Sequence, residues 1–127
     1  MLRSAIALVM VTVGLLLAAC IVDTRLENSV EAPIFVDSVE VIAGDGGEYT
    51  ALARGHLPDA CTSIAQVEQE VDGTTINITL IGARPADQMC AQMLTPFEES
   101  IPLDVEGLEA GTYLVVVNGA STTFNYP

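Results

Sequence analysis

The stretch that decides the fold is AQVEQEVDGTTINITL, residues 65–80. Asp72-Gly73 at its centre is a strong signal for a two-residue turn between antiparallel strands. When the chain folds there, one face of the hairpin is mostly apolar and the other wholly polar, because successive side chains of a strand point to opposite faces. Away from the turn, only Gln69 is polar on the apolar face, and a one-residue slip would mix the faces. The predicted pairs are Val71 with Thr74, Gln69 with Ile76, Val67 with Ile78 and Ala65 with Leu80.

A second hairpin follows from Asn118-Gly119, which joins residues 112–117 to 120–126. The run Leu114–Val117 is apolar on both faces, which favours a central strand. Further strands are expected at 34–43, 49–57 and 101–105. About seven strands with turn signals at regular spacing predict an all-β fold, an antiparallel β-sandwich.

One corner of this fold carries a family resemblance. The stretch Gly107–Tyr113, followed by Val115 and Val117, resembles the corner before the penultimate strand of immunoglobulin-like and fibronectin-like domains. The resemblance implies that Tyr113 is structural, with its hydroxyl bonded to the corner backbone. The chain departs from antibody domains, since it has no Trp and Val115 stands where they carry their second Cys. The resemblance therefore implies the architecture alone.

A wider similarity links the chain to uncharacterised domains of secreted bacterial lipoproteins. It rests on residues 57–61, 84–87 and 95–98 together with Cys90, and it covers most of 49–124. Such domains bring no activity with them.

The N-terminus has the order of a secretory signal. Arg3 precedes an apolar run, Ala5–Leu16, and small residues follow. Leu17–Cys20 resembles the lipobox of bacterial lipoproteins, which implies a lipid on the Cys20 sulfur and cleavage before it. The alternative is an uncleaved transmembrane anchor, but an apolar core of about 15 residues is shorter than the roughly 17–25 that a span needs.

The chain is accordingly divided into three parts. Residues 1–19 are the predicted lipoprotein signal peptide, 20–32 the lipidated N-terminus and tether, and 33–127 the β-sandwich domain. We expect the protein in the cell envelope, lipid-anchored on the outer side of the cytoplasmic membrane or in an outer membrane. Its contact with the membrane would be the lipid on Cys20.

Cysteine usage agrees with export. Once Cys20 carries a lipid, Cys61 and Cys90 remain, an even pair bound for an oxidising compartment. We predict a disulfide between them. Two free thiols or a metal pair are the alternatives, and a metal would need further ligands. No metal and no cofactor are predicted.

The charge balance limits the partners. After removal of residues 1–19, three Arg face 17 Asp and Glu, so the formal charge is 3 − 17 = −14. This charge repels phosphate backbones and excludes nucleic acid. It is also repelled by anionic headgroups, so the lipid must hold the protein to the membrane.

The irregular stretch of the domain is residues 83–97. Pro85 could begin one short helical turn, with Met89, Cys90 and Met93 facing inward. A loop of this length is usually functional or pinned, and the disulfide would pin it. The candidate recognition residues are Arg84, Met89, Met93 and Phe97. Alternatively, Met89, Met93 and Leu94 cap the open end of the sandwich.

No catalytic constellation is evident in the sequence. His56 is the only histidine, and Asp59 and Ser63 lie near it without the G-x-S-x-G elbow of a hydrolase. We predict that the protein is not an enzyme. The first function class is a non-catalytic envelope module that binds a protein, peptide or glycan, or spaces other components. The alternative is a small regulator, such as a protease inhibitor presenting the 83–97 loop.

Overall fold

The computed structural model describes residues 28–127, so the predicted signal peptide and Cys20 lie outside the described residues. Eight strands make up this part of the chain, and between residues 28 and 127 no helix is long and apolar enough to cross a membrane. The strands are β1 (Ser29–Pro33), β2 (Phe35–Ala43), β3 (Tyr49–Leu57), β4 (Ser63–Asp72), β5 (Thr75–Pro85), β6 (Thr95–Pro102), β7 (Gly111–Val117) and β8 (Ala120–Tyr126).

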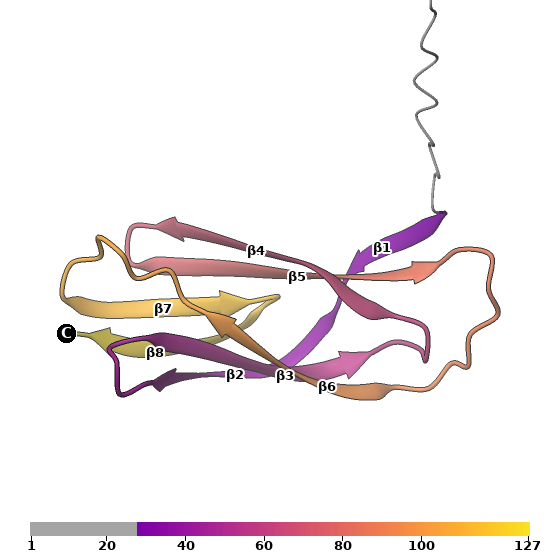
Figure 1. The fold of residues 1–127 in the computed structure, drawn as a ribbon, viewed down its shortest axis with the longest axis horizontal. Helices are drawn as coiled ribbons and strands as arrows, with labels where there is room; N and C mark the ends of the chain where they lie inside the picture. The colour runs from indigo at the N-terminus through magenta and orange to yellow at the C-terminus, as the bar shows by residue number, and fades with distance from the viewer. Residues whose placement is uncertain (1–27) are drawn as a thin grey trace, which may run out of the picture.

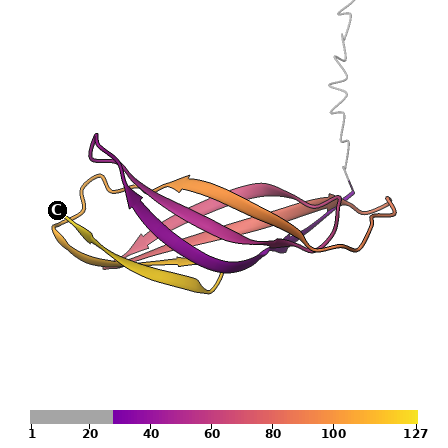
Figure 2. The ribbon, with the colours of Figure 1, turned by 90° about the horizontal axis from the view of Figure 1, so that it is seen from below.

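The strands form two layers and run along the long axis of an elongated molecule (Figures 1 and 2). One sheet has the order β2-β3-β6, and the other contains β4, β5, β7 and β8 with β1 added. Strand β4 follows one edge of β5, while β1 and β7 share its other edge end to end. The predicted all-β sandwich is confirmed, with eight strands instead of about seven.

One ladder departs from antiparallel pairing. Residues Thr75–Ile78 of β5 pair in parallel with Leu114–Val117 of β7. Between these two strands the chain crosses to the other sheet and returns along β6, so it enters β7 in the direction of β5. A parallel pair needs a long crossover of this kind.

The core lies between the sheets. In β5 alternate residues are buried, as expected when only one face of a sheet is covered. Small Ala51 and Ala53 of β3 face them and are fully buried. The largest fully buried side chains are Ile76, Leu80, Val115 and Val117.

The corner before β7 carries the hydrogen bond that the immunoglobulin-like resemblance implies. The Tyr113 hydroxyl donates to the Glu109 carbonyl at 2.7 Å, and the ring is buried. The structural role predicted for Tyr113 is confirmed.

The register of the β4–β5 hairpin differs from the prediction. Asp72 pairs with Thr75 and Val71 with Ile76, a displacement of two residues along β5. The turn residues are Gly73 and Thr74, and Gly73 has a φ of 60°, which a type II′ turn requires at its first central position. A displacement by two leaves the side chains between Gln66 and the turn on their predicted faces. Ile76, Ile78 and Leu80 are buried as expected, but Val67 and Val71 of β4 are 44% and 40% exposed.

Gln69, the polar residue on the apolar face, joins the two sheets. Its Nε2 donates to the Pro102 carbonyl at 3.1 Å, and its Oε1 accepts from the Asp104 amide at 2.7 Å. These bonds satisfy the backbone where β6 ends. A polar residue at this position therefore ties β4 to the end of the facing strand.

Two predicted boundaries are wrong, that of the tether and that of the strand at 101–105. The predicted tether ran to residue 32, but β1 begins at Ser29 and pairs with β5. It lacks an apolar pattern because all five of its side chains are exposed. Strand β6 spans 95–102 instead of 101–105, and its Pro96 is tolerated because β6 is an edge strand.

The β7–β8 hairpin has the predicted register, with Tyr113 opposite Phe124 and Val117 opposite Ala120. Asn118 in its turn adopts a φ of 45°. Its Nδ2 donates to the carbonyls of Ile34 and Leu80, each at 2.8 Å, and its Oδ1 accepts from the Leu80 amide at 2.9 Å. The side chain thus bridges the junction on β5 between the end of β1 and the end of β7.

Candidate functional site

The candidate site is the end of the molecule where the described chain begins. It consists of the β5–β6 loop (residues 86–94), the β3–β4 loop (residues 58–62) and Asn28. The Ala86 amide donates to the Asn28 carbonyl at 2.6 Å, and the Ala60 amide donates to the Ala91 carbonyl at 3.0 Å. Figure 1 shows the two loops and the start of β1 at one end and the C-terminus at the other.

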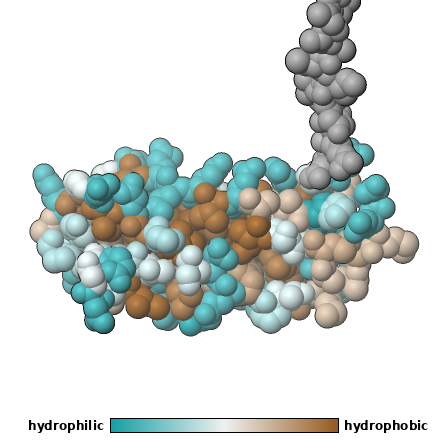
Figure 3. Space-filling model, viewed as in Figure 1, coloured by the Kyte–Doolittle hydropathy of each residue, from teal (hydrophilic) through white to brown (hydrophobic). Residues whose placement is uncertain are grey.

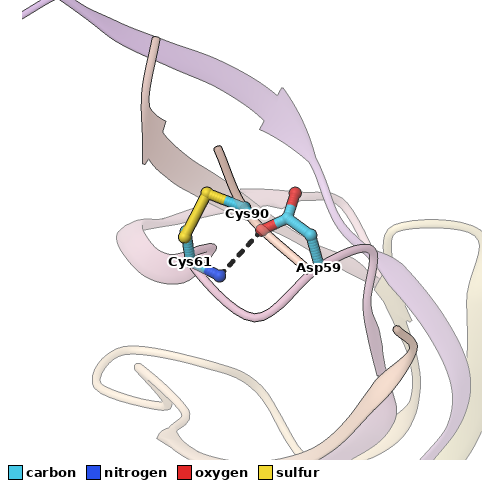
Figure 4. A group of neighbouring side chains, drawn as sticks. All are labelled: Asp59, Cys61 and Cys90. Carbon is cyan, nitrogen blue, oxygen red and sulfur yellow. Dashed lines mark hydrogen bonds between the residues drawn. A yellow bond between two sulfur atoms is a disulfide. The ribbon is translucent and has the colours of Figure 1, made fainter. Parts of the chain in front are cut away.

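A disulfide joins the two loops, as the sequence predicts. Cys61 and Cys90 are bonded, with their Cα atoms 5.7 Å apart and a sequence separation of 29 (Figure 4). The alternative of two free thiols is wrong for this structure. Asp59 lies close enough to both sulfurs for a three-residue metal cluster. Each sulfur is already bonded to the other, however, and the pair supplies no thiolate ligand in this form.

Asp59 is buried beneath this disulfide, with its side chain 7% exposed. Its Oδ1 accepts from the Cys61 amide at 2.9 Å and from the amide and hydroxyl of Thr62 at 2.8 Å. Its Oδ2 lies 3.7 Å from Nη1 of Arg84. The carboxylate therefore shapes the β3–β4 loop. An Asp with a Thr three residues later is the sequence signal that could have found it.

Opposing effects act on the pKa of Asp59. Burial raises the pKa of the carboxyl. Hydrogen bonds from the Thr62 hydroxyl and from the amides of Cys61 and Thr62, together with the charge of Arg84, lower it by more, so it lies below the ordinary value of 3.8. The folded protein thus binds this proton less readily than the unfolded chain.

Asp59→Asn should therefore lower stability in a pH-dependent way. Because the folded pKa is depressed, the contribution of the charge is complete above pH 3.8 and is lost as the pH falls through the folded pKa. The difference in unfolding free energy between wild type and variant should be constant near neutrality and shrink in acid. Urea denaturation from pH 7 to pH 2 measures it, with exposed Asp87→Asn as control. A difference that does not change with pH would contradict the expectation.

The β5–β6 loop exposes three large apolar side chains. Met89 is fully exposed, and Met93 and Leu94 are 60% and 71% exposed. The predicted helical turn is absent from residues 83–97, and the predicted inward direction of Met89 and Met93 is wrong. The capping interpretation is wrong for the same reason. The bonds at Cys90 and Ala91 hold the loop against its neighbour, which opposes the winding of a helix.

The other two candidate recognition residues lie in strands. Arg84 is in β5, opposite Val30 of β1, and its guanidinium faces the buried carboxylate of Asp59. Phe97 is in β6 and packs against the core. The Phe97 ring also lies beside Gly55, where an added Cβ would be 2.9 Å from the ring. Arg84 and Phe97 thus make structural contacts at the base of the loop, and Met89 and Met93 are its exposed side chains.

The remaining polar candidate is His56. Its Nδ1 lies 2.8 Å from Oδ2 of Asp37, and both side chains are partly exposed. Of the two residues considered with it, Asp59 is bonded within the β3–β4 loop, and Ser63 begins β4 opposite Ala83. The structure therefore pairs His56 with a residue that sequence proximity did not indicate.

Fold and site together define a β-sandwich with one end fastened by a disulfide. The chain belongs to the ORF11 beta-sandwich domain family, whose model matches residues 51–126. Two similar proteins are the uncharacterized 10.2 kDa proteins in the HgiBIM and HgiEIM 5′ regions of Herpetosiphon aurantiacus. Each is 41% identical over 65 residues, which is 51% of this chain and 78% of the relative. No solved structure matches the chain.

Proposed function

We propose that the protein is a non-catalytic lipoprotein of the cell envelope, anchored through Cys20, whose β-sandwich binds a protein, peptide or glycan or spaces other components. The observation that carries the proposal is the fastened end of the sandwich. Three exposed apolar side chains lie on a loop that a disulfide and a backbone hydrogen bond hold in place. Rigid scaffolds that present exposed loops are typical of binding modules.

The lipid anchor is supported by the sequence order and by the disulfide. Leu17–Cys20 resembles a lipobox at the end of an apolar run, and a disulfide between the other two cysteines suits an exported protein. Stable anchoring takes more than one acyl chain, which a diacylglyceryl group provides. The acidic domain is repelled by anionic headgroups, so the anchor is the part that holds the protein to the membrane.

The alternative function, a protease inhibitor, draws on the same loop. Its exposed segment Met93-Leu94 begins two residues after Ala91, which is held with Cys90 against the β3–β4 loop. A loop held in this way could enter a protease cleft at little cost in conformational entropy. Incubating the protein with a panel of envelope proteases separates the two functions. Stoichiometric inhibition would favour the inhibitor, and its absence across the panel would favour the binding or spacing module.

Cys20→Ser should abolish acylation. Expressed in bacteria with a clickable palmitate analogue, the wild-type chain should become labelled and partition with membranes, and the variant should not. The matched control is the double variant Cys61→Ser/Cys90→Ser, which keeps Cys20 and should be labelled like wild type. Label that stays on the Cys20→Ser variant would overturn the anchor, because serine offers no sulfur for the thioether.

A further inference from the structure

The β5–β6 loop, which carries the three exposed apolar side chains, begins at the point where the N-terminal chain enters the domain. Asn28 accepts a hydrogen bond from Ala86, the first residue of that loop, at 2.6 Å. Its neighbour Ser29 pairs with Pro85 at the end of β5. The described chain therefore begins at the base of the loop, and whatever holds the N-terminus also holds this end of the sandwich.

The chain between the anchor and this point is short. Eight residues, 21–28, separate Cys20 from β1. Fully extended they span at most roughly 29 Å. If Cys20 carries the lipid, the end of the domain with Met89, Met93 and Leu94 lies within that distance of the membrane.

The loop is suited to the contact. Residues 88–97 carry no charge, whereas the described chain as a whole has 15 Asp and Glu against two Arg. In Figure 3 the end that the β5–β6 loop occupies carries atoms on the hydrophobic side of the colour scale. Transfer of Met and Leu side chains from water to a bilayer interface is favourable, because it removes apolar surface from water. Acidic side chains elsewhere on the surface do not.

We propose that the β5–β6 loop docks on the lipid bilayer through Met89, Met93 and Leu94, so that the anchored domain stands with this end against the membrane. The inference rests on the proposed lipid anchor, and it adds an orientation to it. The lipid on Cys20 holds the protein to the membrane, and the loop determines which end of the sandwich faces the bilayer. The C-terminal end, with the β2–β3 turn, then points away (Figure 1).

A single-tryptophan experiment tests the docking, because the chain contains no Trp. The lipidated full-length protein carrying Met93→Trp is reconstituted in phosphatidylcholine vesicles, with and without bromine atoms on the acyl chains. The matched control is Ile42→Trp, at an exposed apolar position near the far end of β2. Both replaced side chains are exposed, so neither change should alter folding, and circular dichroism verifies this.

The Met93→Trp protein should show a blue-shifted emission on vesicles and lose most of its intensity to brominated lipid. The Ile42→Trp protein should show neither effect. Adding Met89→Ser and Leu94→Ser to the Met93→Trp protein should weaken the quenching while the protein still floats with the vesicles.

Three other outcomes would each overturn the docking and are distinguishable. Protein that floats with the vesicles but keeps its Met93→Trp intensity refutes the docking and leaves the anchor intact. Acylation-competent preparations that do not float at all refute the anchor, and the docking fails with it. A blue shift that depends on protein concentration and is insensitive to bromine would instead assign the loop to a second copy of the chain.

Discussion

Asn118→Gly should lower the unfolding free energy of the domain by roughly 2–4 kcal/mol, because two backbone groups of buried residues lose the hydrogen bond from this side chain and a third keeps one of its two bonds. The Asn118 side chain bonds the Ile34 carbonyl and the Leu80 amide, and it shares the Leu80 carbonyl with the Ile34 amide, which donates to that oxygen at 3.3 Å. Glycine tolerates the positive φ at this turn position, so the substitution removes the side chain without adding backbone strain.

Urea denaturation followed by circular dichroism measures this loss. A destabilisation of 2–4 kcal/mol corresponds to a fall in melting temperature of roughly 10–25 °C for a domain of this size. Asn125→Ala is the matched control, since Asn125 makes one exposed hydrogen bond to Thr112. It should stay within about 0.5 kcal/mol of wild type. An Asn118→Gly protein as stable as that control would show that the junction on β5 does not depend on this side chain.

Removing the disulfide should cost about 3.6 kcal/mol. The bond closes a loop of 29 residues, and the chain-entropy model gives this value for the restriction of the unfolded chain. Cys61→Ala/Cys90→Ala tests it without leaving a free thiol in the domain. The bond between Ala60 and Ala91 does not involve sulfur, so the two loops keep part of their connection.

As a control, the unfolding free energy of the oxidised wild-type domain is compared with that of the same protein after reduction and alkylation. Alkylation adds bulk at half-buried sulfurs, so the reduced protein should be at least as unstable as the double alanine variant. Intact mass should rise on alkylation only after reduction. If the double variant loses less than about 1 kcal/mol, the entropic account of this crosslink is wrong.

The parts of the fold that could be predicted are those in which a local signal agrees with the side-chain pattern. Asn118-Gly119 specifies a two-residue turn, and the flanking residues 112–117 and 120–126 then pair as expected. Asp72-Gly73 also specified a hairpin, but the glycine occupies the first turn position instead of the second, which displaced the register by two. The face assignment survives because the side-chain period in a strand is two.

The parts that could not be predicted depend on partners distant in sequence. Strand β1 is recognisable only through its backbone pairing with Ile81–Pro85, since none of its side chains is buried. In the sequence, Gln69 is a polar residue on an apolar face without a visible reason. The reason is its pair of hydrogen bonds with Pro102 and Asp104, which lie more than 30 residues away. The pattern of residues 112–117 predicts a strand but not that it pairs in parallel with β5, which depends on the route of β6.

The candidate site likewise has one feature that the sequence predicts and one that it does not. The Cys61–Cys90 bond could be predicted by counting cysteines, since no geometry was needed. The direction of Met89 and Met93 could not, because a Met one or three residues from a half-buried Cys is compatible with either face of a turn. Which face is exposed depends on the bond between Ala60 and Ala91, which holds the loop backbone against the β3–β4 loop.

Strand β1 also determines how a mechanical load on the N-terminus reaches the domain. A pull from that side first acts on Ser29–Pro33, whose side chains are all exposed and which is held to β5 by backbone pairing. The first buried side chain along this path is Ile34, and its carbonyl is bonded to Asn118. Five residues, about 17 Å of extended chain, can therefore be drawn out of the sheet before any buried side chain is displaced.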